Sequence, residues 1–265
     1  MPRPAVSVLM NCLNGARYLQ EALDSVEAQT FTDWELVFWD DASTDDSQKI
    51  ALCSRLSRLK PPLLRYFRGK GNQPLGASRN LALEECRGRY VALLDCDDTW
   101  QSQKLARQVW RMENDHDANF TFSDCYLIGP DGRRYGTYFE RYAMPYTSRS
   151  CYRSLLTQSN FMPSPTLMWN SALLRKVGGF SPQLRYAEVY EACVRMAQQF
   201  SGVGYKGEPL ASYRIHAGQR GGKGRLGMTS EVLDVLSQHR GQAGWRQYLR
   251  EGLLWARYGW QLAHR

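Results

Sequence analysis

The sequence predicts an α/β fold in which a mostly parallel, doubly wound sheet is flanked by helices. Apolar strand-like segments alternate with amphipathic helical segments over the first hundred residues, as in repeated β–α units. Ala5–Met10 and Trp34–Trp39 are predicted strands, and apolar residues from Leu19 to Val26 recur between them at helical spacing. Tyr90–Leu94 is a further buried strand that ends in a cluster of carboxylates.

Polar residues stand where three of these predicted strands end. Asn11 follows the first strand, Asp40 and Asp41 follow the second, and Asp95–Asp98 follows Tyr90–Leu94. Ligands of doubly wound sheets bind beyond the carboxyl ends of the strands. We therefore expect these polar residues to face one crevice.

The segment after Tyr90–Leu94 carries three carboxylates within four residues, on Asp95, Asp97 and Asp98. Such crowding at the end of a buried strand costs stability unless a cation compensates the charge. If the strand continues, Asp95 and Asp97 point to the same face and can hold one hard divalent metal, completed by phosphate oxygens and water. The alternative is a polar turn, in which aspartate is common.

Composition narrows the class of protein. The 265 residues suit one large domain with an appendage, and the net charge of +8 suits anionic partners, although no nucleic-acid-binding signature accompanies it. The seven cysteines are scattered without a C-x-x-C pair, which argues against a disulfide framework or a zinc site and for a reducing compartment. Because no signal-peptide core or membrane-spanning run is present, we expect a cytoplasmic protein.

Six short segments, taken in order and spacing, carry a resemblance to a known family: Val6–Gly15, Glu35–Asp45, Gly76–Asn80, Leu94–Asp98, Val177–Phe180 and Tyr213–His216. They resemble family 2 glycosyltransferases with the GT-A fold. The resemblance implies a Rossmann-like central sheet flanked by helices, a nucleotide-sugar donor, and Mg²⁺ or Mn²⁺.

The resemblance also assigns residues to the donor nucleotide. Asp41 is similar to the family's aspartate that binds the base, where a carboxylate accepting from the uracil N–H favours a UDP-sugar. Asp40 would orient Asp41 or bond the ribose. Asn11 and Leu13 stand where relatives often have a hydroxyl residue and a tyrosine that packs on the base; Leu13 keeps an apolar contact but loses ring stacking.

Other positions match the family's metal and sugar sites. Asp97 resembles the principal metal ligand, and Asp95 its partner that reaches the ribose or the metal through water. His216 matches a third metal-facing position, with a structural role, the commoner one for a single histidine, as the alternative. Arg79 would bond the donor phosphates or ribose, with solvated surface as the alternative. Trp100 would lie near the sugar or acceptor, with a place in the core as the alternative.

The base of an inverting transfer is the point where the chain departs from the family. Relatives have a carboxylate where this chain has Val189, which fits an apolar helix face instead. We expect the neighbouring Glu188 to substitute as the base that takes a proton from the acceptor hydroxyl. Glu191 is a second candidate, for which an i,i+4 ion pair with Arg195 is the favoured alternative.

The predicted function is metal-dependent, inverting transfer of a sugar from a nucleotide sugar to a hydroxyl acceptor, a glycan or a lipid-linked glycan. Cell-envelope polysaccharide is the family's commonest destination. One alternative, suggested by Val189, is a non-catalytic or weakly active sugar-nucleotide-binding partner subunit. Another is a nucleotidyltransferase.

We expect residues 1–216 to form the main domain, with a nucleotide-binding half (1–100) and an acceptor half (101–216). Asn119–Ile128 and Val203–Ile215 are predicted strands of the second half. A Gly-rich basic linker (217–228) would lead to a small helical appendage (229–265). Its tryptophans, leucines and arginines suit peripheral contact with an anionic inner membrane face; packing on its own domain or in a homodimer are the alternatives.

Overall fold

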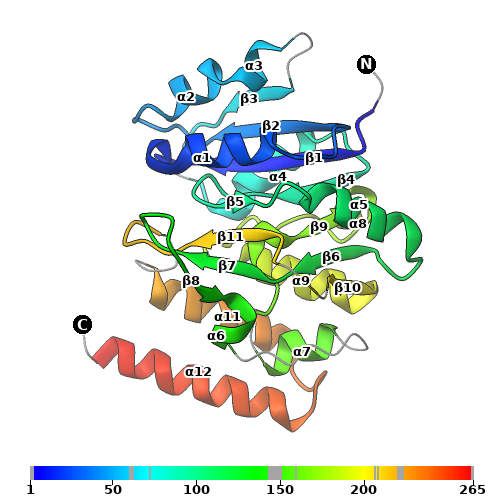
Figure 1. Cartoon of the computed structure of the whole chain (residues 1–265). Helices are drawn as coiled ribbons and strands as arrows, with labels where there is room; N and C mark the ends of the chain where they lie inside the picture. The colour runs from blue at the N-terminus through cyan, green and yellow to red at the C-terminus, as the bar shows by residue number, and fades with distance from the viewer. Residues whose placement is uncertain are drawn as a thin grey trace.

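The computed structural model describes residues 3–59, 63–71, 73–142, 151–158, 160–205, 207, 209–219 and 224–263. Within these residues, seven strands form a central sheet in the order β10-β6-β9-β4-β1-β2-β3 (Figure 1). The strands are β1 (Val6–Cys12), β2 (Trp34–Asp40), β3 (Leu64–Arg68), β4 (Tyr90–Leu93), β6 (Phe120–Ser123), β9 (Met168–Asn170) and β10 (Gly202–Tyr205).

The half of the sheet built from the first hundred residues is parallel throughout. β1 pairs with β2 and with β4, and β2 pairs with β3, all in parallel register. In the second half β9 runs antiparallel to both β4 and β6, while β10 is parallel to β6. The predicted mostly parallel sheet is therefore confirmed.

A smaller sheet of four strands lies beside the central one, in the order β5-β11-β7-β8 within the described residues. Its strands are β5 (Thr99–Trp100), β7 (Cys125–Ile128), β8 (Arg134–Thr137) and β11 (Ala211–Arg214). It corrects two predicted strands, because Asn119–Ile128 is divided between β6 and β7, and Val203–Ile215 between β10 and β11. At the first break, Asp124 accepts hydrogen bonds from the backbone N–H groups of Cys125 (2.8 Å) and Phe139 (3.0 Å), and this local bonding replaces a continuous strand.

Helices cover both faces of the central sheet and bury two apolar clusters. They are α1 (Ala16–Glu27), α2 (Ser47–Cys53), α3 (Arg55–Arg58), α4 (Leu75–Glu85), α5 (Lys104–Asn114), α6 (Tyr138–Tyr142), α7 (Cys151–Thr157), α8 (Ser171–Lys176) and α9 (Glu188–Gln199), with the short 3₁₀ helix η1 (Ser164–Thr166). On one face α1 and α5 pack on side chains such as Val8 and Met10. On the other, α4, α7 and α9 pack on Leu9 and Leu93. Successive residues of β1 thus serve opposite cores, as expected for a strand covered on both sides.

Two helices end the chain, α11 (Arg225–Gln238) and α12 (Trp245–Ala263). The first begins at Arg225 rather than at residue 229, and residues 220–223 of the predicted linker lie outside the described residues. Figure 1 shows α12 (red) at the opposite end of the molecule from α2 and α3, where it packs on α11 and α7. No helix in the described part of the chain has the length and apolar character that a membrane crossing needs.

One side chain of α11 ties this appendage to the main domain. The carboxylate of Glu231 accepts hydrogen bonds from three consecutive backbone N–H groups, those of Arg185 (2.9 Å), Tyr186 (2.8 Å) and Ala187 (2.8 Å). Ala187 is the N-cap residue of α9, immediately before Glu188. The helical appendage therefore helps to fix the chain at the start of α9.

We predict that Glu231→Gln lowers the free energy of unfolding by about 1–3 kcal/mol, because a neutral amide replaces a carboxylate that satisfies three donors. Urea unfolding measures this loss. Glu113→Gln is the matched control: Glu113 pairs with Arg89 on the surface, and such pairs contribute about 0–1 kcal/mol. A loss no larger than the control's would contradict the role assigned to Glu231.

Candidate functional site

The carboxyl ends of β1, β2 and β4 meet at one edge of the sheet. Asn11 is paired in register with Trp39, and Cys12 with Asp40. The backbone N–H of Asp41 donates to the carbonyl of Cys12 at 2.8 Å, and that of Leu94 donates to the carbonyl of Leu9 at 3.1 Å. The predicted convergence of the three polar segments is confirmed.

Asp95–Asp98, which we call the acidic turn, is not a continuation of β4. The backbone N–H of Asp98 donates to the carbonyl of Asp95 at 3.2 Å and closes a turn. The expectation that Asp95 and Asp97 share a strand face is therefore wrong. The reason is local chemistry, since aspartate-rich segments favour turns, and each of the three carboxylates finds a different partner.

Asp95 is held by a buried arginine. Arg79 on α4, only 2% exposed, donates to Asp95 Oδ1 from Nη2 (2.8 Å) and to Glu188 Oε1 from Nε (3.0 Å). Burial alone lowers the pKa of Arg79, but the two carboxylates outweigh it and hold that pKa above its usual value. Ser164 donates to the second oxygen of Asp95 at 3.2 Å, so both of its oxygens accept bonds.

Asp97 faces a histidine instead. Its Oδ2 lies 3.0 Å from Nε2 of His216, whose ring also packs against Tyr18 with a centroid distance of 5.0 Å. The side chains of Asp97 and His216 are 25% and 15% exposed, so both are partly accessible to solvent.

Asp98 points into the protein. Its Oδ1 accepts a hydrogen bond from the backbone N–H of Arg214 at 2.8 Å, and Arg214 Nε donates to the carbonyl of Asp97 at 2.9 Å. Burial, and then the neighbouring charges of Asp97 and Asp95, raise the pKa of Asp98 well above its usual range. Asp98 is 1% exposed; its Oδ1 stabilises the turn, and its Oδ2 has no hydrogen-bond partner among the described residues.

The donor set fits a divalent cation. Within the described residues no group of three or more His, Cys, Asp or Glu side chains is arranged to hold a metal. Asp97 and His216 nevertheless offer an oxygen and a nitrogen close enough to share one ion, and a diphosphate and water would complete its ligands. Asp95 already gives both oxygens to protein donors, so its position suits a contact through water.

At the edge of the sheet where β1 and β2 end, four buried polar atoms have no hydrogen-bond partner among the described residues. They are both amide atoms of Asn11, Oδ1 of Asp41 and Nε1 of Trp39. A Cβ built on Gly69 would lie 2.9 Å from Trp39 Nε1 and 3.1 Å from Asp41 Oδ1, so only a glycine leaves room beside them. Unsatisfied buried donors and acceptors are costly, which marks this edge of the sheet, where the crevice is predicted, as a place for a polar ligand.

Leu13 directly follows β1, and Asp40 is the last residue of β2. Leu13 is 43% exposed, as an apolar side chain offered to a ligand would be. Asp40 is fully buried and accepts from Ser43 N–H (2.7 Å), Tyr66 O–H (2.6 Å) and Arg68 Nη1 (3.0 Å). Both its oxygens are occupied, so its placement does not support a bond to a ribose and fits the other expectation, that it orients the Asp41 loop.

The three candidate residues of α9 have different surroundings. Val189 packs in an apolar cluster with Cys193 and Met196, so its predicted place in the core is confirmed. Glu191 pairs with Arg195 through contacts that include Arg195 Nη2 to Oε2 at 2.5 Å, which confirms the favoured alternative for Glu191. Glu188 faces Arg79 instead, next to the acidic turn.

Trp100 lies in the interior. It is 4% exposed, and its Nε1 donates to the carbonyl of Pro165 at 2.7 Å. Nζ of the buried Lys104 lies 4.0 Å from the centre of its ring. The indole face is therefore covered by protein, the core alternative accounts for Trp100, and we leave it out of the site.

Sequence analysis missed how two of its motifs join. Asn80 donates to the carbonyl of Phe180 from Nδ2 at 2.6 Å, and its Oδ1 accepts from the N–H of Phe180 at 2.8 Å. Gly179, with φ of +66°, passes so close that a Cβ there would lie 2.5 Å from Asn80 Oδ1, and a Cβ on Gly76 would lie 1.9 Å from the carbonyl of Ser181. This contact docks α4 against the loop before α9 and brings Arg79 to Glu188. In the sequence, Asn80 and these glycines were the residues from which this contact could have been predicted.

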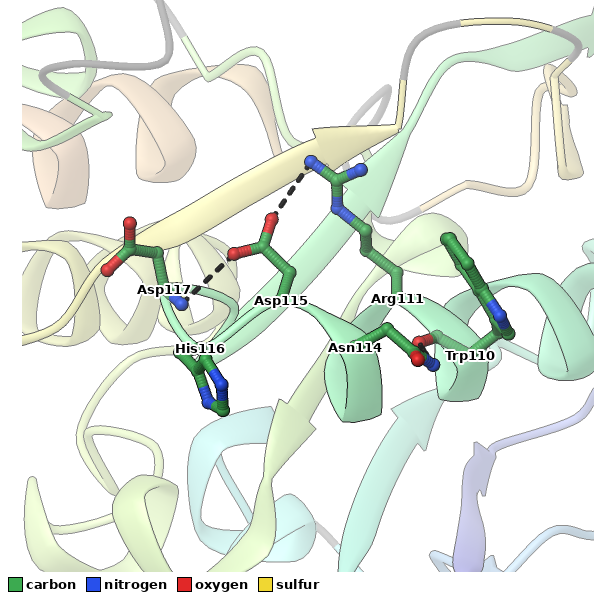
Figure 2. A pocket seen from close by; sticks show the side chains of 6 residues that line it. All are labelled: Trp110, Arg111, Asn114, Asp115, His116 and Asp117. Atoms are coloured by element: carbon green, nitrogen blue, oxygen red, sulfur yellow. Dashed lines mark hydrogen bonds and ion pairs between the residues drawn. The ribbon is translucent and has the colours of Figure 1, made fainter.

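A hollow of about 360 Å³ lies at the end of α5, away from this site (Figure 2). Figure 2 shows Arg111 turned toward Asp115, which also accepts from the backbone N–H of Asp117. The segment leads into the amino end of β6, opposite to the strand ends that carry the acidic turn. Nε of Arg111 has no hydrogen-bond partner among the described residues, but this single atom does not define a ligand site, so we assign the hollow no function.

Known proteins resemble this chain in sequence and in fold. A model of the family described as "Glycosyl transferase family 2" matches residues 7–177, more than half of the chain. An uncharacterized glycosyltransferase of Nostoc sp. is 30% identical over 96% of this chain and 77% of its own length. TuaG of Bacillus subtilis, whose name assigns it to teichuronic acid biosynthesis, is 32% identical over 49% of this chain and 50% of its own length.

Solved structures share the GT-A fold at low sequence identity. S. aureus TarS in complex with UDP-GlcNAc superposes with a TM-score of 0.67 at 19% identity, over 87% of this chain and 66% of that chain. The mannosyltransferase PcManGT from Pyrobaculum calidifontis, in complex with GDP-Man and Mn²⁺, gives 0.65 at 19% identity, over 97% and 70%.

The family match favours a glycosyltransferase over a nucleotidyltransferase, and it agrees with the crevice, the acidic turn and the sheet order described above. The chain belongs to glycosyl transferase family 2, and it is a glycosyltransferase of the GT-A fold.

Proposed function

We propose that the chain transfers a sugar from a UDP-sugar to a hydroxyl acceptor with inversion at the anomeric carbon, in the presence of Mn²⁺ or Mg²⁺. The observation that carries the proposal is the buried contact of Arg79 with both Asp95 and Glu188. It links the acidic turn, beside which a diphosphate would lie, to the carboxylate best placed to accept a proton.

The base pocket supports a uracil nucleotide. Oδ1 of Asp41 is an unpartnered buried acceptor and matches the imide N–H of uracil, while Nδ2 of Asn11 and Nε1 of Trp39 are donors that match its carbonyl oxygens. Leu13 would cover one face of the ring. TarS structures with UDP and UDP-GlcNAc agree with this choice, whereas PcManGT binds GDP-Man, so the base needs a direct test.

Asp97 and His216 would hold the cation, whose positive charge stabilises the diphosphate as the sugar bond breaks. Asp95, fixed by Arg79 and Ser164, would accept from the ribose or a bound water. The structural neighbour that contains Mn²⁺ supports a divalent ion in general and leaves the choice between Mg²⁺ and Mn²⁺ to experiment.

Glu188 is the proposed base. It is 3% exposed, and one of its oxygens, Oε2, has no partner among the described residues, while Oε1 accepts from Arg79. Arg79 thus holds the side chain in one orientation and leaves an oxygen able to accept the proton of an acceptor hydroxyl. Because Val189 cannot accept a proton, a sugar-nucleotide binder without transfer is the second candidate function.

The acceptor is proposed to be a cell-envelope glycan or a lipid-linked glycan, in line with the name of TuaG. The exposed side chains of Trp245, Leu249 and Leu253 on α12 support peripheral contact with the inner membrane face, where a lipid-linked acceptor would be reached. The same helix buries Gln247 and Glu251 against its own domain, so it is also part of the fold.

We predict that UDP together with Mn²⁺ raises the melting temperature of the protein, with a stabilisation of about 2.7 kcal/mol at a ligand concentration 100-fold above Kd. Asp97→Asn should lose the Mn²⁺-dependent part of the shift, because it removes an anionic ligand. Asp117→Asn, an exposed change in the hollow of Figure 2, should keep it. GDP serves as the comparison for the base. An equal shift in Asp97→Asn would contradict the metal assignment, and the absence of any shift with UDP would contradict the donor assignment.

We predict that Glu188→Gln lowers kcat by about 10²- to 10⁴-fold, because the transfer loses its general base. Burial raises the pKa of Glu188 above its usual value of 4.5, despite the opposing effect of Arg79. The wild-type rate should therefore fall as pH drops through this raised pKa, since the protonated side chain cannot act as a base. A pH–rate profile measures the effect.

The same shift predicts a pH-dependent stability. Between pH 4.5 and the raised pKa of Glu188 the folded state binds more protons than the unfolded state, so stability falls as pH rises through that window. Glu188→Gln should remove this slope.

Glu191→Gln is the control for the rate measurement, and it should keep the fall in rate at acid pH. Transfer by Glu188→Gln at the wild-type rate would exclude Glu188 as the base, and no transfer by the wild type would favour the non-catalytic binder.

A further inference from the structure

Two cysteines meet at the centre of the proposed site. Cys12 is the last residue of β1, and Cys96 stands inside the acidic turn that follows β4. Leu9 of β1 and Leu93 of β4 are paired neighbours in the sheet, and each cysteine follows its paired leucine by three residues. The strand pairing ends at these leucines, so the surroundings of the side chains, and not strand register, bring the two cysteines together.

The side chains of the two cysteines face the same space. A Cβ built on Gly15, at the start of α1, would lie 2.5 Å from Cys96 Sγ and 2.9 Å from Cys12 Sγ. Both sulfur atoms therefore lie directly beneath one glycine, and no side chain separates them.

The other cysteines do not share this arrangement. All seven cysteines lie in the described residues as free thiols, and five of them are buried: Cys12 and, away from the pair, Cys86, Cys125, Cys151 and Cys193. Cys53 is exposed and lies on α2, so it provides a matched control for the reactivity of an accessible thiol.

We propose that Cys12 and Cys96 form a redox modification site, in which a peroxide converts the two thiols into a disulfide. The thiolate of one of the two cysteines attacks the peroxide, gives a sulfenic acid and releases one water from hydrogen peroxide. The thiol of the other cysteine then attacks the sulfur of that sulfenic acid, the S–S bond forms and a second water leaves. The two thiols lose two electrons in total, and these reduce one peroxide to two waters.

The disulfide would connect the acidic turn to the end of β1. Cys96 lies between Asp95 and Asp97, so a covalent bond to Cys12 restricts the backbone that carries both carboxylates. A displacement of about 1 Å in a reacting geometry costs on the order of 100-fold in rate. The effect on transfer rests on the proposed function, whereas formation of the disulfide does not.

The covalent step is tested on the wild-type protein by peptide mapping. After treatment with hydrogen peroxide and alkylation, non-reducing mass spectrometry should show one peptide pair joined through Cys12 and Cys96, which dithiothreitol separates. Cys53→Ser should give the same pair, and Cys12→Ser should give none. Oxidation of Cys96 to sulfinic or sulfonic acid without the joined pair would overturn the proposal.

The functional step compares each protein with its own reduced form, so differences in basal activity cancel. Oxidised wild type and oxidised Cys53→Ser should lose transfer on the order of 100-fold, together with the Mn²⁺-dependent thermal shift by UDP, and recover with dithiothreitol. Oxidised Cys12→Ser should retain both. A joined pair that leaves UDP binding and transfer unchanged would refute the effect on the site. Absence of UDP binding by the reduced wild type would instead refute the proposed function, and leave the mapping result to decide the disulfide.

Discussion

The structure depends on how it neutralises three carboxylates that stand within four residues at the end of a buried strand. Each has its own partner: Asp95 is paired with Arg79, Asp97 with His216, and Asp98 with the backbone of Arg214. Among these partners, only His216 offers a partly exposed imidazole. A cation can therefore replace the contact of Asp97 with His216 while the buried ion pair of Asp95 with Arg79 stays intact. Breaking that ion pair would cost about 3–5 kcal/mol.

This division of charge explains the packing around the turn. Arg79 can reach both Asp95 and Glu188 only because α4 is docked against the loop before α9, through the Asn80 contact with Phe180 and the close approach of Gly76 to Ser181. Glu231 fixes the same loop from the far side, through three backbone N–H groups. The start of α9, and with it Glu188, is thus held from both directions. Such rigid placement is what a proton transfer between fixed groups requires.

Strong local patterns predicted much of the fold and the position of the site. Alternating strands and helices were enough to predict the parallel half of the sheet, and the carboxyl ends of β1, β2 and β4 do converge. The first of these predicted strands breaks at Asp124, which bonds locally, and the second is divided because β10 and β11 pair in different sheets; neither break follows from periodicity. The acidic turn was misjudged for a similar reason, because alternation within a strand was assumed where three aspartates favour a turn.

Side-chain roles were harder to predict than positions. In the structure Trp100 is buried in the core and Glu191 pairs with Arg195. The sequence had already offered these two roles as alternatives to a place in the site. The contact of Arg79 with Glu188 joins residues 109 positions apart, so no local pattern could reveal it. Glu231 lies in a segment that resembles no family motif, and its three hydrogen bonds appear only once α11 is packed.

The most direct test of this account is the anomalous diffraction of manganese in a crystal soaked with Mn²⁺ and UDP. We expect one manganese peak within bonding distance of the Asp97 carboxylate and the His216 ring, next to the diphosphate, with Asp95 still paired to Arg79. A peak elsewhere in a crystal whose crevice holds UDP, or Asp95 released from Arg79 to ligate the metal, would contradict it.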